Sequence, residues 1–320
     1  MNVLLTGATG FVGKPVTNQL AQDNYFNVFA VVRENSKQLV SNVKQIVIGD
    51  LLSGPAWERH LSGIDVVVHI AARAHIMNDK ALDPLLEFRK MNVEVTLNLA
   101  GQAAQAGVKR FVFISSIKVN GEATDEGSFF TPDDAYITSD PYAISKREAE
   151  LGLRKIAEET GMDVVIVRPP LVYGPGVKAN FRSLIKWTRR GVPLPLGSVH
   201  NKRSFVALDN LVDFIIVCTK HPKAANEIFL ISDGEDVSIT TLLHKIAQAL
   251  DKKAMLISVP VSAMKCVAKL LGKGDVADRL FGSLQVDISK SSSLLGWKPL
   301  VTMDEQLKKI SEVYDNEKSL

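Results

Sequence analysis

Tyr142 and Lys146 are the two residues whose types and spacing most clearly suggest chemistry. They stand four residues apart in PYAISK (141–146), inside a stretch rich in Ala, Lys, Arg and Glu that is typical of a helix. This spacing places both side chains on one helix face. A nearby ammonium lowers the pKa of a phenol, so the pair could form a tyrosinate that takes a proton from a hydroxyl while hydride leaves to a nicotinamide.

Ser115 and Ser116 are the second candidate group. They follow the apolar run RFVFI (110–114), which predicts a buried strand, and Ser116 lies 26 residues before Tyr142. Open α/β sheets bind their ligands at the carboxyl ends of strands. A serine hydroxyl there could hydrogen-bond the reacting oxygen, and the alternative is an ordinary polar turn.

Gly7, Gly10 and Gly13 form a G-x-x-G-x-x-G pattern between a short apolar run and a helical stretch. Glycines allow a tight turn and a close backbone approach to a pyrophosphate, while the helix N-terminus offers free N–H groups. The position of the pattern, directly after a strand at the start of the chain, indicates a dinucleotide site.

The residues that would choose between NAD and NADP leave both cofactors open. Arg33 stands at the end of the second apolar run, where an acidic residue for the ribose diol is expected. An arginine there suits a 2′-phosphate, but it could also stack on adenine or face solvent, and Glu34 could serve the diol. Asp50, after the third run, could meet the adenine edge or cap the following helical segment.

Apolar runs alternating with helical stretches indicate an α/β fold, a doubly wound parallel sheet of the Rossmann type. The expected strands are 3–6, 28–32, 45–48, 65–70, 110–114 and 163–167, and the expected helices are 12–21, 85–106 and 142–160. After Arg168 the chain becomes rich in Pro and Gly. We therefore expect a domain at 1–168 and a smaller α/β substrate domain at 169–320, with helices at about 180–190, 209–218, 240–251 and beyond 303. A strand near 228–232 is expected to return to the first domain.

Composition excludes several classes of function. The 320 residues carry a net charge of only +3, so the overall field does not call for nucleic acid. No stretch reaches the roughly 20 apolar residues of a membrane span, and no signal peptide is recognisable, so we expect a cytoplasmic protein without a membrane partner. Cys218 and Cys266 are expected to be buried thiols, and neither they nor the histidines have metal-ligand spacing.

The motifs together resemble the extended short-chain dehydrogenase/reductases, the NAD-dependent epimerase/dehydratase family. The matching segments are TGATGFVG (6–13), GDL (49–51), VVHIAARAH (67–75), MNVEVTLNLA (91–100), FISS (113–116), PYAISK (141–146), RPPLVYGPG (168–176), RSFVALDNLVD (203–213) and LGWKP (295–299). They occur in the family's order over most of the chain.

The resemblance implies a role for particular residues. Ser116, Tyr142 and Lys146 would form the catalytic trio. The NAD or NADP site would include Gly7, Gly10, Phe11, Val12, Gly13, Arg33, Asp50, Leu51, Ala71, Ala72, Asn92, Tyr142 and Lys146. Ser116, Asn180, Arg203 and, more weakly, Arg279 would bind a UDP-sugar, and a homodimer would form through the two long helices at 85–106 and 142–160.

Two positions bear on the reaction. In the family's 4,6-dehydratases an Asp-Glu pair follows the catalytic hydroxyl, whereas Ile117 and Lys118 stand here, which removes the acid and base for elimination. Asn120 also departs from the usual tyrosine of V-Y-G. The expected function is 4-epimerisation of a UDP-hexose or UDP-N-acetylhexosamine; the alternative is NAD(P)H-dependent reduction of a 4-keto-6-deoxy UDP-sugar. A non-catalytic NAD(P)-binding regulator and a reductase of non-nucleotide carbonyls are less favoured, because the trio is intact and Arg203 suits a diphosphate.

Overall fold

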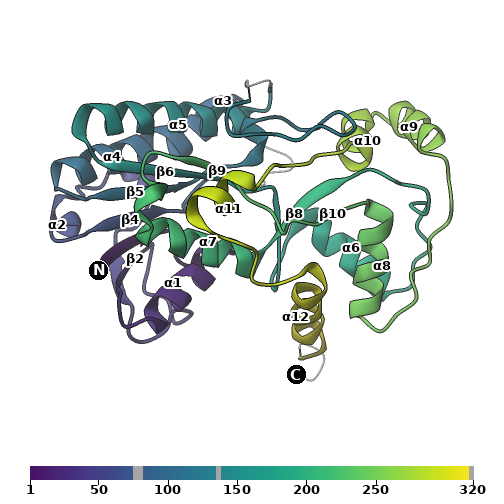
Figure 1. Cartoon of the computed structure of the whole chain (residues 1–320), viewed down its shortest axis with the longest axis horizontal. Coiled ribbons are helices and arrows are strands. Elements are labelled where there is room, and N and C mark those ends of the chain that lie inside the picture. The colour runs from purple at the N-terminus through teal and green to yellow at the C-terminus, as the bar shows by residue number, and fades with distance from the viewer. Residues whose placement is uncertain (75–81, 135–137, 317–320) are drawn as a thin grey trace.

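A parallel sheet of seven strands forms the larger part of the molecule (Figure 1). The computed structural model describes residues 1–74, 82–134 and 138–316. The strand order is β3-β2-β1-β4-β5-β6-β9, and every neighbouring pair is parallel. The strands are β1 (Asn2–Thr6), β2 (Asn27–Val32), β3 (Lys44–Val47), β4 (Val66–His69), β5 (Arg110–Ile114), β6 (Asp163–Arg168) and β9 (Ile228–Leu230). The order reverses between β1 and β4, which creates the crevice where doubly wound sheets bind ligands.

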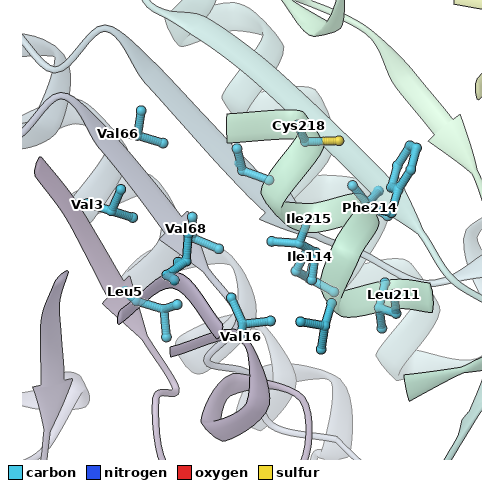
Figure 2. Packing of buried hydrophobic residues seen from close by; sticks show 14 of the residues in the cluster. Val3, Leu5, Val16, Val66, Val68, Ile114, Leu211, Phe214, Ile215 and Cys218 are labelled. Atoms are coloured by element: carbon cyan, nitrogen blue, oxygen red, sulfur yellow. The ribbon is translucent and has the colours of Figure 1, made fainter. Parts of the chain in front are cut away.

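The central strands are apolar on both sides because both faces of the sheet are covered there, whereas the edge strand β3 is only partly buried. In β1, Val3 and Leu5 point into one buried cluster, whereas Leu4 points into another on the opposite face. Figure 2 shows the first cluster, in which strand residues pack against Val16 and Phe214 from the covering helices. These side chains are almost completely buried, so the sheet is held by apolar contacts from two sides.

Helices from separate parts of the chain supply the two covers. One face carries α1 (Gly13–Gln22) and α7 (Leu208–Lys220), and the other carries α2 (Glu58–Leu61), α4 (Val95–Gln105) and α5 (Pro141–Thr160) (Figure 1). This arrangement confirms the expected fold class. It also places the N-termini of α1 and α5 at the carboxyl edge of the sheet, where β1 and β5 end.

The helix expected over 85–106 is interrupted by one π-helical segment. Its parts are α3 (Pro84–Arg89), η2 (Lys90–Glu94) and α4. A π segment inserts an extra residue into a helix and is frequent at functional sites. Here it contains Asn92, which is fully buried beside the site described below.

A second, three-stranded sheet has the order β10-β8-β7, with one antiparallel and one parallel pair. Its strands are β7 (Leu171–Tyr173), β8 (Arg203–Ala207) and β10 (Asp236–Val237), and the helices α6 (Ala179–Arg189), α8 (Ile239–Ala249) and α12 (Met303–Asn316) share its apolar core. β9 lies in the larger sheet, beside β6. The division of the chain at residue 168 stays a prediction.

Four α-helices were not expected from the sequence. They are the short α2, α9 (Val261–Leu270), α10 (Gly274–Phe281) and α11 (Ser289–Leu295). α9 carries Cys266, which is exposed, so the expectation of two buried thiols is wrong for Cys266 and holds for Cys218. No helix in the described part of the chain is long and apolar enough to cross a membrane.

Candidate active site

The glycine loop joins β1 to α1 at the carboxyl edge of the larger sheet. Gly7 has a φ of +73°, and a Cβ there would lie 2.7 Å from the amide nitrogen of Ala71. A Cβ on Gly13 would lie 2.0 Å from the carbonyl oxygen of Gly7, whereas the Gly10 N–H donates to that oxygen at 2.9 Å. The loop therefore needs glycine at positions 7 and 13 to pass this close to the neighbouring backbone.

The N-terminus of α1 offers donors to an anion. Val12 is its N-cap residue and makes no side-chain hydrogen bond to the first turn. The first N–H groups of a helix have no partner within the helix and carry a partial positive charge. Phe11 and Val12, both partly buried, belong to this turn. The cradle fits the pyrophosphate of a dinucleotide, which is the chemistry expected of the glycine pattern.

Asn92 connects the cofactor side of the site to the catalytic helix. Its amide donates to the Ser145 hydroxyl at 3.0 Å and to the Arg73 carbonyl at 3.1 Å, and its side-chain oxygen accepts from the Arg73 N–H at 2.8 Å. These bonds hold the segment after β4, which contains Ala71 and Ala72, beside α5. Because Asn92 is fully buried and bonded on both ends, it fixes the wall of the crevice as well as lining it.

Arg33 and Asp50 lie after β2 and β3, which are adjacent strands of the sheet. Both residues are exposed. The Asp50 carboxylate accepts from the Leu52 N–H at 3.0 Å and caps the short helix η1 (Leu51–Ser53), which is the capping role considered for it above. Contacts of Arg33, Asp50 and Leu51 with the adenosine end of a cofactor stay predictions.

Ser116, Tyr142 and Lys146 come together where β5 ends and α5 begins. Asp140 caps α5 by accepting from the Tyr142 and Ala143 N–H groups at 2.8 and 3.3 Å, and Pro141 occupies the first turn. The Ser116 hydroxyl, just beyond β5, lies beside the Tyr142 phenol and acts to lower its pKa, and it also accepts from the Lys118 N–H at 3.3 Å. The structure thus brings together all three residues of the expected trio.

Lys146 is buried, with 1% of its surface exposed. Its ammonium donates to the Ile114 carbonyl at 2.8 Å and lies 4.4 Å from the centre of the Phe113 ring. Burial lowers the pKa of Lys146 to about 7, against the attraction of Glu150. The ammonium is therefore easily deprotonated in the protein alone.

The pKa of Tyr142 moves in the direction opposite to the one expected from its spacing to Lys146. Burial raises the pKa of the Tyr142 phenol to about 12, although the hydrogen bond from Ser116 acts to lower it, and the charge of Asp140 raises it further. Lys146 does not contribute the expected lowering; its amine, with a pKa of about 7, is neutral where this phenol titrates. A phenolate at neutral pH therefore needs additional positive charge beside this ring.

A buried ion pair supports the next turn of α5. Glu150 and Arg168 are each 1% exposed and pair through two hydrogen bonds of 2.6 and 3.0 Å. The Ser115 hydroxyl donates to Glu150 at 2.5 Å, and Arg168 donates to the Asn120 side chain at 3.1 Å. Sequence reasoning missed Glu150 as a support of the site, although its spacing of eight from Tyr142 and four from Lys146 puts it on the same helix face. Asn120, the departure from V-Y-G, is part of this network.

His69, at the end of β4, is another buried polar residue beside the glycine loop. Its ring contacts the hydroxyls of Thr6 and Thr96 at 2.7 and 3.0 Å. Burial, assisted by the charge of Lys146, lowers the pKa of His69 to about 3, so the ring is neutral. Across residues 1–74, 82–134 and 138–316, no group of three His, Cys, Asp or Glu side chains is placed to hold a metal ion, and His75 lies outside the described residues.

The candidate substrate residues come from three separate segments. Arg203, in β8, donates to the carbonyls of Arg279 and Gly282 at 2.7 and 2.9 Å, so the structure brings Arg203 and Arg279 together. Burial lowers the pKa of Arg203. Asn180, at the start of α6, is exposed. Their contacts with a sugar nucleotide stay predictions.

A chain of charges links α10 to the start of α5. Arg279 pairs with Glu122 at 3.1 Å, Glu122 lies 3.4 Å from the Lys118 ammonium, and Lys118 also pairs with Asp140. Although burial opposes ionisation of Asp140, the bond from Lys118 and the two backbone donors hold the pKa of that carboxyl below its ordinary value. Lys118 therefore supports the cap of the helix that carries Tyr142.

Comparison with known proteins agrees with this geometry. Residues 3–232 match the model of the NAD dependent epimerase/dehydratase family. The chain belongs to this family. It is 47% identical over 314 residues to a UDP-glucose 4-epimerase of Vibrio cholerae, covering 98% of this chain and 95% of that protein. As a member of the NAD-dependent epimerase/dehydratase family, it is an NAD-dependent enzyme similar to nucleotide-sugar epimerases.

Solved structures show the same fold along the whole chain. A UDP-glucose 4-epimerase from Thermotoga maritima with UDP-glucose has a TM-score of 0.78 and 26% identity, with 99% of each chain covered. A UDP-glucuronic acid 4-epimerase from Bacillus cereus in complex with NAD has a TM-score of 0.79 and 22% identity, covering 98% of this chain and 100% of that one. Within the NAD-dependent epimerase/dehydratase family, Ile117 and Lys118 remain a departure from the dehydratases' carboxylate pair.

Proposed function

We propose that the protein is an NAD-dependent nucleotide-sugar 4-epimerase that acts on a UDP-hexose or a UDP-N-acetylhexosamine. The observation that carries the proposal is the convergence of Ser116, Tyr142 and Lys146 at the sheet edge that also holds the glycine cradle. The 47% identity to the Vibrio cholerae UDP-glucose 4-epimerase supports the choice of reaction and of nucleotide.

The chain would hold NAD along the carboxyl edge of the larger sheet. The glycine loop and the start of α1 receive the pyrophosphate, and the segment of Ala71 and Ala72, fixed by Asn92, lines the side nearest α5. When bound, NAD supplies a hydride acceptor whose nicotinamide ring carries a positive charge. A positive charge at this position favours the ionised form of a neighbouring phenol.

Tyr142 is the proton acceptor in this proposal. As a phenolate it takes the proton of the sugar C4 hydroxyl and later returns a proton to the same oxygen. Ser116, whose hydroxyl lies beside the phenol, orients the C4 oxygen. Lys146, when it is protonated, stabilises the phenolate. It lies on the same helix face as Tyr142.

Arg203, Arg279 and Asn180 would hold the UDP diphosphate and sugar on the opposite side of the crevice. Arginines suit this task because their fixed donors match phosphate oxygens. The two residues after Ser116 are not carboxylates. Ile117 is buried, and Lys118 pairs with Asp140. The residues present therefore favour proton and hydride transfer at a single carbinol carbon over elimination of water.

The experiment that tests this function supplies the purified protein with UDP-glucose or UDP-N-acetylglucosamine and a catalytic amount of NAD. Formation of the 4-epimer, followed by NMR, without net production of NADH supports the proposal. The Tyr142→Phe variant is the control for contaminating activity. Absence of epimer from every UDP-hexose and UDP-N-acetylhexosamine offered, with NAD bound, would overturn it.

Arg33 favours a second candidate, the NADPH-dependent reduction of a 4-keto-6-deoxy UDP-sugar. It is exposed at the end of β2, where a guanidinium could meet a ribose 2′-phosphate. Stoichiometric consumption of NADPH with the keto sugar would support this reaction. Arg33→Asp should then shift the preference from NADPH towards NADH, and an unchanged preference would remove this argument.

We also propose a cytoplasmic homodimer paired through α4 and α5. These helices pack against each other, and Leu151 of α5 keeps 51% of its surface exposed. Leu151 is therefore a surface position at which a charge would disrupt such an interface without disturbing the core. Light scattering should give the mass of a dimer for the wild-type chain and of a monomer for Leu151→Glu.

A further inference from the structure

α9 carries a stripe of exposed apolar side chains. Ala263, Cys266, Val267 and Leu270 follow the three- and four-residue spacing of one helix face, and all four are exposed. Leu270 is 82% exposed and Val267 56%, and no residue of α9 is buried. We name these four residues, together with the adjoining Leu271, the α9 stripe.

The opposite side of α9 fixes the helix to the protein. Val261 and Met264 are partly buried and pack against the apolar core of the second sheet. α9 also packs against α10, whose Val276 is 58% exposed. Figure 1 places both helices at the end of the molecule remote from α2 and β2. The α9 stripe is thus held facing outward on an ordered helix, away from the glycine cradle.

Basic residues predominate in this part of the chain. Residues 252–274 contain five lysines and neither Asp nor Glu, whereas the whole chain has a net charge of +3. The rest of the chain therefore sums to −2. Lys265 and Lys269 belong to α9 itself, and Lys273 follows it; Lys265 pairs with Asp278 of α10 at 2.8 Å. Apolar side chains bordered by lysines form a surface complementary to a layer that is apolar inside and anionic outside.

We propose that the α9 stripe and its flanking lysines dock the protein on an anionic lipid bilayer. The apolar side chains would enter the boundary between headgroups and acyl chains, while the lysine ammonium groups would stay at the anionic phosphates. A second copy of the chain fits this surface less well. In a two-fold dimer the same patch meets itself, so the lysines would face lysines. The expectation that no membrane partner exists rested on membrane spans and overall charge, neither of which describes a surface of this kind.

Vesicle flotation of the full-length protein tests the proposal. Vesicles of phosphatidylcholine alone are compared with an equimolar mixture of phosphatidylcholine and phosphatidylglycerol. We expect roughly tenfold more protein to float with the anionic vesicles, and this excess to disappear at about 1 M salt, where the Debye length is about 3 Å. Equal flotation with both kinds of vesicle, or none with either, would overturn the proposal.

The native cysteines supply a second readout. Cys266 is exposed within the α9 stripe and Cys218 is buried, so a polarity-sensitive maleimide dye labels Cys266 selectively. Its emission should shift to the blue on addition of anionic vesicles. If the dye emission shows no blue shift although the unlabelled protein floats, another surface binds the lipid, which contradicts the proposal.

Two matched variants separate the stripe from other exposed leucines. Leu270→Glu should abolish most flotation, whereas Leu300→Glu, at a leucine that is 65% exposed and outside the stripe, should float like the wild type. Both variants should keep the unfolding midpoint and turnover of the wild type. If Leu270→Glu floats normally and instead changes the mass measured by light scattering, the surface serves contact between copies and the proposal is wrong.

Discussion

The carboxyl edge of the larger sheet and the surface around α10 contribute to the site in different ways. At the sheet edge the polar groups are buried and bonded to one another: Asn92 is fully buried, and Lys146 and Glu150 are each 1% exposed. Around α10 the groups stay in contact with water, since the Arg279 side chain is 55% exposed and that of Glu122 33%. Removing a hydrogen-bonding or charged partner costs far more stability when the remaining polar group is buried than when it is exposed.

The difference assigns separate tasks to the two regions. The side chains at the sheet edge determine where a proton and a hydride can move. Each of them must therefore be held in one conformation. The α10 surface has to take up and release a charged ligand, so its cations must remain accessible. Substitutions at the sheet edge should therefore affect turnover or folding strongly, and substitutions near α10 should affect mainly the affinity for substrate.

The largest effect is expected from Tyr142→Phe. The change removes the proton acceptor but keeps the ring that packs at 5.8 Å against Phe88. We expect kcat to fall by about 10³-fold or more, because loss of a general acid–base group costs about 10²–10⁴-fold. The measurements are kcat with the UDP-sugar and the Kd of NAD by calorimetry. Near-normal turnover would exclude Tyr142 as the acceptor, and lost NAD binding would show that the variant tests the fold instead.

Glu150→Gln should reduce stability more than any other single change in charge proposed here. It leaves the Arg168 guanidinium buried without its counter-ion, and breaking such a pair costs about 3–5 kcal/mol. Urea unfolding measures the change. Glu159→Gln is the control, because Glu159 lies on the same helix and its pair with Lys155 is 3.7 Å long and exposed. Equal stabilities of the two variants would contradict the difference between buried and exposed pairs.

The sheet edge is also the region that the sequence describes best. Apolar runs predicted six of the seven parallel strands within two residues of their ends, and β9 was expected near 228–232, because a strand covered on both faces needs consecutive apolar residues. The glycine loop and the Tyr142–Lys146 spacing were recognisable because each is local in the chain. The ion pair of Glu150 with Arg168 was not, since it joins two elements whose contact is set by packing.

The region of α9–α11 was missed for physical reasons as well. Ser262, Lys265 and Lys269 form a narrow polar face on α9, but apolar residues occupy both its inner and its outer side, so ten residues give only a weak periodic signal. α11 has seven residues, three of them consecutive serines, which are weak helix formers. The pKa of Tyr142 could not be predicted either, because it is set mainly by burial of the ring, which depends on packing between separate elements.

Arg203→Met is expected to weaken substrate binding. Removal of one charge-assisted contact to the diphosphate costs about 1.5–3 kcal/mol, which raises KM about 10–100-fold while kcat changes little. Steady-state kinetics with the UDP-sugar separate the two constants. Arg279→Gln, at an exposed position, should raise KM by less. A fall in kcat with unchanged KM would place Arg203 outside the diphosphate site.

The smallest effect is expected from Lys118→Met, which connects the two regions. Its ammonium offsets the charge of Asp140, and that charge raises the pKa of Tyr142. Without Lys118 the pKa of the phenol should rise further, so less phenolate forms at neutral pH. We expect kcat at pH 7 to fall by a few fold, since a shift of half a pKa unit changes the ionised fraction by about threefold. The rise of kcat with pH should move to higher pH, and Lys118→Arg, which keeps the charge, should restore the wild-type profile. A profile that falls equally at all pH values would show that Lys118 acts only through the cap of α5, without an electrostatic effect on Tyr142.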